Sequence, residues 1–247
     1  MPPSPSSPKL PRILADRGLA ESELGDEDLR YRVKRELRKR ALGLRKTTPL
    51  EACDGRSALI VAKLEALDPL RAARSVALFW PIVARHEIDL RPLDEALRRR
   101  GVRVAYPAIE PSAEAPHRMT FRFVEDVSGL EERGFGFSEP PLDAFPVSAD
   151  LREIDVVVVP ALALDPTGQR IGYGVGYYDR ALKGTATTKV GVIYDFQLVP
   201  EVPATRGDVP VDWVVTDRRA FSAMPTEPPR IEGLPGASPD TEPPCPL

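Results

Sequence analysis

Four short apolar segments, separated by stretches with helical periodicity, constrain the fold of this 247-residue chain more than any other feature. Each is almost continuously apolar and rich in β-branched or aromatic side chains. Such strands are typical of a sheet that is covered on both faces, because a strand with one wet face alternates in polarity. The predicted buried strands are 75–80 (SVALFW), 102–106 (VRVAY), 155–161 (DVVVVPA) and 190–194 (VGVIY).

Two other segments are predicted as strands of a different kind. Residues 119–124 (MTFRFV) alternate in polarity, which indicates an edge or antiparallel strand. Residues 213–216 (WVVT) are a weaker candidate for one more strand.

A capped helix is predicted between the first two buried strands, in the segment EIDLRPLDEALRRRG. Leu90, Leu93 and Leu97 recur at spacings of three and four residues, as on one face of an α-helix. Asp89 can cap the start of this helix, and Gly101 ends it. Strand, helix and strand form a βαβ unit. The sequence therefore predicts α/β: a single open, mostly parallel sheet with helices on both faces, Rossmann-like and three-layered.

Proline marks the two ends of the chain. The sequence holds 28 prolines, about twice the usual frequency of roughly 5%. Five lie in the first eleven residues and eight between Pro225 and Pro246. Segments of this composition bury too little apolar surface to offset the entropy of ordering them. We therefore predict disordered tails at 1–24 and 223–247, and one α/β domain at 25–222.

Charge and hydropathy argue against several classes of protein. A net charge of −3 and a pI near 5.6 disfavour a dedicated nucleic-acid binder. No apolar run reaches the roughly 18 residues that span a bilayer. Cys53 and Cys245 are too few for a disulfide scaffold. We expect a cytoplasmic monomer that binds a small-molecule substrate and neither nucleic acid nor membrane.

The glycine-rich segment after the third buried strand is the strongest candidate for a binding site. Gly172, Gly174 and Gly176 alternate, so that backbone N–H groups can approach a phosphate without hindrance from Cβ atoms. Arg170 offers a guanidinium fork to phosphate oxygens, and Asp179 could hold a phosphate-bound Mg²⁺. The plainer interpretation is a glycine-rich turn before a helix.

Two other nucleotide motifs fit this segment poorly. It is not a P-loop, because no Gly-Lys-Ser/Thr follows. Tyr177 stands at the place of the third glycine of a dinucleotide fingerprint, and the following helix has to end near Gly184. Asp195, at the end of the next strand, lies about where a ribose-binding acid is expected, so this alternative stays open.

The second basic feature is the predicted amphipathic helix 30–46. It contains nine basic residues and one acidic residue, Glu36. Lys34 and Arg38 are four residues apart on one face and could grip a polyphosphate. The alternative is a solvated basic surface. The apolar stripe predicted to pack on the core is Val33, Leu37, Ala41 and Leu44.

Three acids are candidate ligands, each with a plainer alternative. Glu87 follows a strand's carboxyl end, where ligands bind in open α/β sheets, or it is a first-turn acid of the next helix. Asp208 and Asp212 are turn formers, or one of them joins Asp179 as a metal carboxylate. We expect no functional role for Cys53 in a polar linker, or for His86 and His117 on the surface.

Four segments, in this order, resemble one known family: KRELRKRAL, HEIDLRPLDEALRRRGVRVAYP, DVVVVPALALDPTGQRIGYGVGYYDRAL and GDVPVDWVVTD. They are similar to the 5-formyltetrahydrofolate cyclo-ligases, also called 5,10-methenyltetrahydrofolate synthetases, over roughly 29–217. The most specific part is R-x-G-x-G-x-G-Y-Y-D, from Arg170 to Asp179.

This resemblance implies an ATP- and Mg²⁺-dependent closure of 5-formyltetrahydrofolate to 5,10-methenyltetrahydrofolate, with release of ADP and phosphate. A non-catalytic folate- or nucleotide-binding paralogue and a nucleotide-dependent enzyme of other specificity are the alternatives. The implied metal carboxylates are Asp179 and Asp208, and the implied catalytic residues are Lys34 and Arg170. The implied ATP contacts are Lys34, Arg35, Glu36, Leu37, Arg38, Arg170, Ile171, Gly172, Tyr173, Gly174, Val175, Gly176, Tyr177 and Tyr178. The implied folate contacts are Ile82, Glu87, Tyr173, Gly174, Val175, Gly176 and Tyr177.

Overall fold

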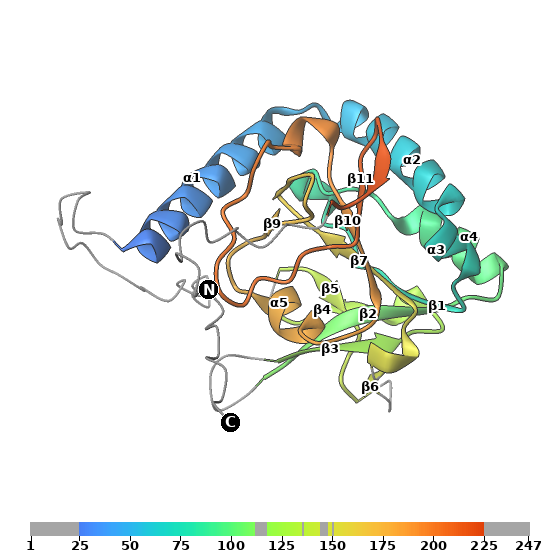
Figure 1. The fold of residues 1–247 in the computed structure, drawn as a ribbon. Helices are drawn as coiled ribbons and strands as arrows, with labels where there is room; N and C mark the ends of the chain where they lie inside the picture. Colours follow the sequence, from blue (N-terminus) through green and yellow to red (C-terminus); the bar gives the residue numbers. More distant parts are fainter. Residues whose placement is uncertain (1–24, 112–117, 135, 144–147, 150, 225–247) are drawn as a thin grey trace, which may run out of the picture.

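An eight-stranded sheet forms the centre of the fold, in the order β12-β11-β10-β7-β1-β2-β3-β6 (Figure 1). Neighbouring strands from β11 to β2 pair in parallel, whereas β12, β3 and β6 add antiparallel pairs at the two sides. The predicted open, mostly parallel α/β sheet is therefore confirmed. The strands of this sheet are β1 (Ser75–Ala77), β2 (Arg103–Glu110), β3 (Arg118–Phe123), β6 (Ser148–Ala149), β7 (Val156–Pro160), β10 (Thr188–Val192), β11 (Trp213–Val215) and β12 (Ala220–Ser222).

The computed structural model describes residues 25–111, 118–134, 136–143, 148–149 and 151–224. Two small hairpins accompany the main sheet in these ranges: β4 (Glu131–Glu132) with β5 (Ser138–Glu139), and β8 (Ala163–Leu164) with β9 (Arg170–Ile171). The α-helices are α1 (Asp26–Thr47), α2 (Leu50–Ala66), α3 (Asp68–Ala72), α4 (Arg91–Arg99) and α5 (Tyr177–Leu182).

The two largest apolar clusters lie on the two faces of the sheet, and a third, smaller one lies under α1. On the first face, α2, α3 and α4 pack their leucines against strand residues such as Val104 and Val158. On the second face, the short α5 contributes Leu182, which packs near Val157 and Val214. Figure 1 shows α1 to α4 as an arch on one side of the sheet, with α5 on the other. Helices therefore lie on both faces, as predicted, but the second face is covered by only one short helix and by loops.

The predicted strands are all present, with shifted ends. Segment 102–106 extends to Glu110 as β2, and segment 75–80 shortens to the three residues of β1. Segment 119–124 is β3, which pairs antiparallel with β2 as its alternation indicated. Strand β12 was not predicted, because AFS is too short to show a period.

Helix α4 confirms the βαβ unit and corrects its cap. The helix begins at Arg91 with Leu90 at the N-cap, and Gly101 follows its end at φ +75°. Asp89 lies one residue before the N-cap, where its carboxylate accepts the backbone N–H of Arg91 and binds the Arg91 side chain. Proline in the first turn of this helix leaves fewer N–H groups in need of a cap.

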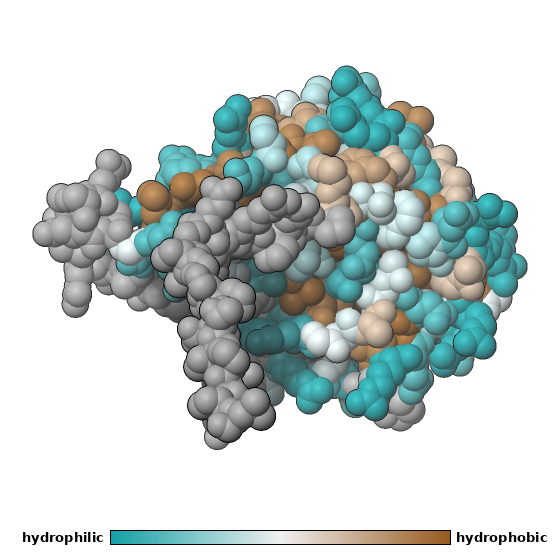
Figure 2. Space-filling view, in the orientation of Figure 1, coloured by the Kyte–Doolittle hydropathy of each residue, from teal (hydrophilic) through white to brown (hydrophobic). Residues whose placement is uncertain are grey.

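Helix α1 packs with a face that only partly matches the one predicted. Its buried residues are Lys34, Ala41 and Arg45, whereas Val33 and Leu44 are exposed. Figure 2 shows hydrophobic side chains on the molecular surface along α1. The helix lies against the β8–β9 hairpin through a small apolar cluster around Ala41. The apolar-stripe prediction is confirmed for Leu37 and Ala41, which belong to this cluster, and wrong for Val33 and Leu44, because Lys34 and Arg45 with their polar partners take the inward positions.

Cys53 and His86 also differ from their predictions. Cys53 is a buried core residue of α2 and not part of a polar linker. His86 is half-buried at φ +57°, and its Nδ1 lies 2.9 Å from the carbonyl oxygen of Thr48. The prediction for His117 lies outside the described residues, as do those for tail residues 1–24 and 225–247. At the start of the predicted tail 223–247, Ala223 and Met224 donate their backbone N–H groups to the carbonyl oxygens of Asp212 and Pro166, so the ordered domain reaches residue 224. Among the described residues, no helix is long and apolar enough to cross a membrane.

Candidate active site

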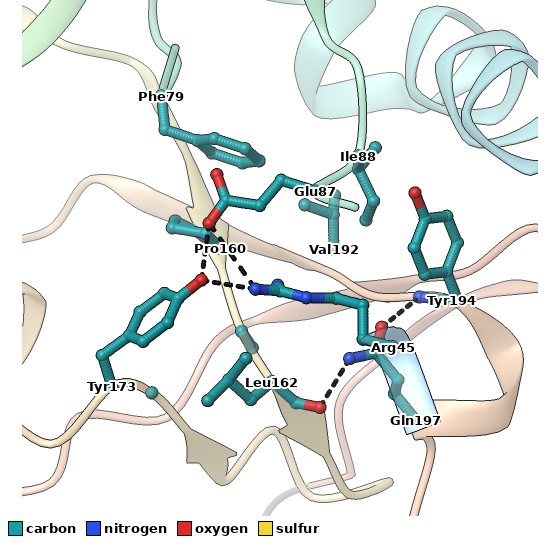
Figure 3. Close-up of a pocket in the computed structure, with 12 residues that line it drawn as sticks. Arg45, Phe79, Glu87, Ile88, Pro160, Leu162, Tyr173, Val192, Tyr194 and Gln197 are labelled. Atoms are coloured by element: carbon teal, nitrogen blue, oxygen red, sulfur yellow. Dashed lines mark hydrogen bonds and ion pairs between the residues drawn. The ribbon is translucent and has the colours of Figure 1, made fainter. Parts of the chain in front are cut away.

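A pocket lies beyond the carboxyl ends of three neighbouring parallel strands (Figure 3). Phe79 follows β1, Pro160 ends β7 and Val192 ends β10, and each lines the pocket. Ligands in open α/β sheets bind at this edge. The remaining lining residues are Arg45, Glu87, Ile88, Ala161, Leu162, Gly172, Tyr173, Tyr194 and Gln197.

Glu87 brings a carboxylate to this largely apolar pocket. Its Oε2 accepts the backbone N–H of Ile82 at 3.0 Å, and its Oε1 accepts the hydroxyl of Tyr173 at 2.6 Å. The guanidinium of Arg45 donates to the same hydroxyl oxygen and lies 3.7 Å from Oε1. Burial, and then the neighbouring Glu87, raise the pKa of Tyr173 to about 12, so this hydroxyl stays protonated at neutral pH. Both carboxylate oxygens are thus held in one orientation.

The glycine segment joins this pocket to the basic helix. Gly174 and Gly176 have φ of +96° and +73°, a conformation that residues with a Cβ rarely adopt. A Cβ on Gly174 would lie 3.1 Å from the guanidinium carbon of Arg38. The Nε of Arg38 donates to the carbonyl oxygen of Gly172 at 2.7 Å, and burial lowers the pKa of its guanidinium. A glycine at position 174 is therefore required for the loop to lie against Arg38.

Lys34 points inward from α1 toward the 201–212 segment. Its Nζ donates to Asp208 and, at 2.9 Å, to the hydroxyl of Thr205. The backbone N–H of Thr205 also donates to Asp208 Oδ2 at 2.6 Å. The Lys34 side chain is 9% exposed, so the solvated-surface interpretation does not hold for this residue.

Arg170 makes the second cation–carboxylate pair. Its Nη2 donates to Asp179 Oδ1 at 2.7 Å, and its Nη1 donates to the carbonyl oxygen of Val209. Asp179 Oδ1 also accepts the backbone N–H of Val209 at 3.0 Å. Burial lowers the pKa of Arg170, while Asp179 and Asp208 act in the opposite direction. Arg170 therefore lies close to both predicted metal carboxylates.

The two carboxylates have features that suit a magnesium ion bound together with phosphate. Every hydrogen bond found for them among the described residues goes to one oxygen, Oδ1 of Asp179 and Oδ2 of Asp208. The other oxygen of each accepts no hydrogen bond within this part of the chain and could bind a cation. Within the same part of the chain, no group of three or more His, Cys, Asp or Glu residues could hold a metal unaided. A hard cation with one or two carboxylates, phosphate oxygens and water is the usual arrangement for Mg²⁺.

Some predicted contacts point elsewhere. Arg35 and Glu36 are exposed on the outer side of α1 and lie beside each other. Ile171 packs under α1, and the ring of Tyr178 meets Phe121 edge to face at 6.3 Å. None of these four residues lines the pocket, although the Tyr178 side chain lies close enough to Glu87 and Arg170 for both to influence its pKa.

Asp195 and Asp212 are engaged in the structure itself. Asp195 accepts from Thr216 and Arg219, which weakens its assignment as a ribose-binding acid. Asp212 pairs with Lys189 at the opposite, amino-terminal end of β10 and β11. Of the two aspartates that flank Pro210, Asp208 is therefore the one near the site.

Arg45 and Thr205 are the site residues that the sequence did not reveal. Arg45 lies eleven residues after Lys34, a spacing that places both on one face of a helix, and this spacing was the available signal. Thr205 comes from a loop, and no local pattern predicts that it meets α1.

Fold and site together define a Rossmann-like α/β protein with a polar site across the carboxyl ends of its strands. A model of the 5-formyltetrahydrofolate cyclo-ligase family matches residues 30–217, and the chain belongs to this family.

Relatives and a solved structure agree with this assignment. The chain is 35% identical over 156 residues to 5-formyltetrahydrofolate cyclo-ligase of Escherichia coli K12, covering 62% of this chain and 83% of the relative. It is 32% identical over 196 residues to the enzyme of Mycolicibacterium smegmatis, covering 78% and 98%. The NMR structure of Aquifex aeolicus 5,10-methenyltetrahydrofolate synthetase superimposes with a TM-score of 0.66 at 29% identity, covering 81% of this chain and all of that one.

Proposed function

We propose that the protein uses ATP and Mg²⁺ to close 5-formyltetrahydrofolate to 5,10-methenyltetrahydrofolate, with release of ADP and phosphate. One observation carries the proposal. The segment from Arg170 to Asp179 has cationic and metal-type groups at its ends, and between them it places Tyr173 on the Glu87 carboxylate of the pocket. A phosphate donor and a folate can thus meet on one loop.

The reaction needs activation of an unreactive group. A formamide oxygen is a weak nucleophile and its carbon a weak electrophile. Transfer of the γ-phosphoryl group to the formyl oxygen breaks the bond to ADP and gives an imidate-like phosphate. The neighbouring folate N–H nitrogen then attacks the formyl carbon and the ring closes. Phosphate leaves with the formyl oxygen, and the proton of that nitrogen is released to the phosphate or to water. Positioning and charge stabilisation suffice for this chemistry, and no protein nucleophile is required.

The residues at the basic end of the site suit the phosphoryl transfer. Lys34 and Arg38 from α1 and Arg170 from β9 are cations that can bind phosphate oxygens. Asp179 and Asp208 would hold Mg²⁺, which neutralises phosphate charge when bound. The backbone of Gly172, Gly174 and Gly176 can approach the same phosphates.

The pocket suits the pterin. Its walls are apolar, and the Glu87 carboxylate has acceptor positions left for the adjacent N–H groups of the pterin ring. Ile82 and the loop from Tyr173 to Tyr177 would complete the folate contacts. We keep the proposal made from the sequence that the protein is a cytoplasmic monomer that binds neither nucleic acid nor membrane.

A coupled assay tests the proposal. The purified protein should release ADP only when 5-formyltetrahydrofolate and Mg²⁺ are both present, in step with formation of the methenyl product. ADP release without folate would indicate a nucleotide-dependent enzyme of other specificity. Folate binding without ADP release would indicate a non-catalytic paralogue. EDTA should abolish turnover, and added Mg²⁺ should restore it.

A further inference from the structure

We propose that Arg45 positions the pterin end of the substrate by holding Glu87 and Tyr173 in their binding arrangement. The inference rests on the proposed function and adds a residue to it. Arg45 comes from the last turn of α1, far in sequence from both residues that it contacts. Figure 3 shows its guanidinium inside the pocket, directed at the Glu87 carboxylate and the Tyr173 hydroxyl.

The burial of Arg45 distinguishes it from an ordinary basic residue at a helix end. Cations near a helix C-terminus are favoured by the helix dipole wherever they point. Lys46 has the same position in the dipole and is exposed, as is Leu44 on the other side. Arg45 is 7% exposed in its side chain, at a desolvation cost that requires compensating partners inside the protein. The helix dipole alone does not explain this placement.

The contacts of Arg45 form a closed triangle with Glu87 and Tyr173. The guanidinium donates to the Tyr173 oxygen, the Tyr173 hydroxyl donates to Glu87 Oε1 at 2.6 Å, and the guanidinium lies 3.7 Å from that same oxygen. The Tyr173 ring also lies 5.7 Å from the guanidinium carbon. With the Ile82 N–H on Oε2, the carboxylate is held from both sides.

A carboxylate held in this way presents its remaining acceptor positions in a set direction. A flat heterocycle with adjacent N–H donors needs both oxygens in its plane, so a rotation of the carboxylate weakens both hydrogen bonds together. The other polar side chains of the lining, Tyr194 and Gln197, have hydrogen-bond partners elsewhere: the Ser57 hydroxyl for Tyr194, and the Tyr194 N–H and Leu162 carbonyl groups for Gln197. Arg45 therefore acts on folate affinity through Glu87, while the phosphate contacts of Lys34 and Arg38, on earlier turns of α1, are independent of it.

The first test compares Arg45→Gln with Lys46→Gln, its exposed neighbour of equal charge. Arg45→Gln should raise the Kd and KM for 5-formyltetrahydrofolate at least tenfold and leave the KM for ATP within twofold. Lys46→Gln should change neither. A purely structural role would lower the melting temperature and leave the folate Kd unchanged, and that result would overturn the proposal. A wild-type protein that neither binds nor converts the folate would instead overturn the proposed function.

A double-substitution cycle tests whether the effect passes through Glu87. Glu87→Gln and Arg45→Gln should each raise the folate Kd at least tenfold, and the double variant should bind within threefold of Glu87→Gln alone. Multiplying effects, about a hundredfold or more in the double variant, would contradict the positioning role.

If Arg45→Gln does not fold, the conservative variant Arg45→Lys tests the proposal instead. Lysine keeps the charge but lacks the planar guanidinium, whose Nη2 contacts both Tyr173 and Glu87 and whose carbon lies 5.7 Å from the centre of the Tyr173 ring. Arg45→Lys should therefore fold and bind the folate at least threefold more weakly than wild type, with nucleotide affinity unchanged. Folate affinity equal to that of wild type would overturn the proposal.

Discussion

The two ends of the site differ in how their charges are satisfied. At the basic end, Lys34 and Arg170 pair directly with Asp208 and Asp179, so each cation already has a carboxylate partner. At the pocket end, Glu87 accepts hydrogen bonds from an N–H group and a hydroxyl, and its cation, Arg45, lies farther away, at 3.7 Å. Helix α1 spans both ends, with about 16 Å of helical rise between Lys34 and Arg45.

This difference separates two kinds of binding. If the proposed function is correct, a Mg²⁺–nucleotide has to take over the partners of existing ion pairs, with phosphate replacing carboxylate on the cations and the metal replacing the cations on the carboxylates. A pterin would instead enter a pocket whose carboxylate is already oriented. Substitutions at the basic end should therefore act mainly on phosphate chemistry, and those at the pocket end on folate affinity.

The largest effect is expected at Arg170. Arg170→Ala should lower kcat/KM at least a hundredfold, on the order of 3 kcal/mol of transition-state stabilisation, because a buried phosphate-binding cation is lost. The variant should also melt at a lower temperature, since Arg170 links β9 to α5 and to the carbonyl oxygen of Val209. Steady-state kinetics and thermal melts measure both. Arg170→Lys, which keeps the charge, should recover part of the activity. Wild-type turnover in Arg170→Ala would show that the phosphate site lies elsewhere.

The next effect tests the basic face of α1. The double change Lys34→Gln and Arg38→Gln should raise the KM for ATP at least tenfold, because charge-assisted hydrogen bonds contribute roughly 1.5–3 kcal/mol each. The folate KM should stay within twofold. Arg40→Gln and Lys46→Gln are controls on the exposed side of the same helix. An equal rise in the KM for ATP after substitution at any of the four positions would show that the helix attracts ATP only as a diffuse basic patch.

A smaller effect is expected from the Tyr173 hydroxyl. Tyr173→Phe should raise the folate KM about threefold to tenfold, since Glu87 loses one of its two close donors. The pKa of Tyr173 is raised to about 12, so the wild-type hydroxyl stays neutral through pH 6–10 and contributes no limb to the pH–rate profile there. The profile of Tyr173→Phe should therefore keep the wild-type shape. Loss of an alkaline limb in the variant would show that Tyr173 titrates during catalysis.

Features that depend on local sequence patterns could be predicted, whereas features that depend on contacts between distant segments could not. The buried strands and α4 were predictable because their periods are local, and β7 and β10 lie close to where their apolar runs indicated. The glycine segment was predictable because its spacing is local too. Helix α1 was misjudged because its inward face carries Lys34 and Arg45, whose partners are supplied by distant segments. Pairings between distant parts of the chain, such as Lys34 with Thr205, leave no local pattern.

The smallest effect is expected from removal of the two terminal segments of the chain. Deleting residues 1–24 and 225–247 should change kcat/KM less than twofold and the melting temperature by less than about 5 °C, because proline-rich segments of this kind bury little apolar surface. Differential scanning calorimetry and kinetics on the truncated protein measure this. A larger fall in melting temperature would show that the domain extends beyond 25–224.

Separate binding measurements on two variants test most directly the claim that the site has a nucleotide end and a folate end. Calorimetry would give the Kd of a Mg²⁺-bound non-hydrolysable ATP analogue and of 5-formyltetrahydrofolate for Glu87→Gln and for the Lys34→Gln, Arg38→Gln double variant. We predict a crossed pattern: Glu87→Gln weakens only the folate, at least tenfold, and the double variant weakens only the nucleotide by a similar factor. Equal weakening of both ligands by either variant would contradict the division of the site.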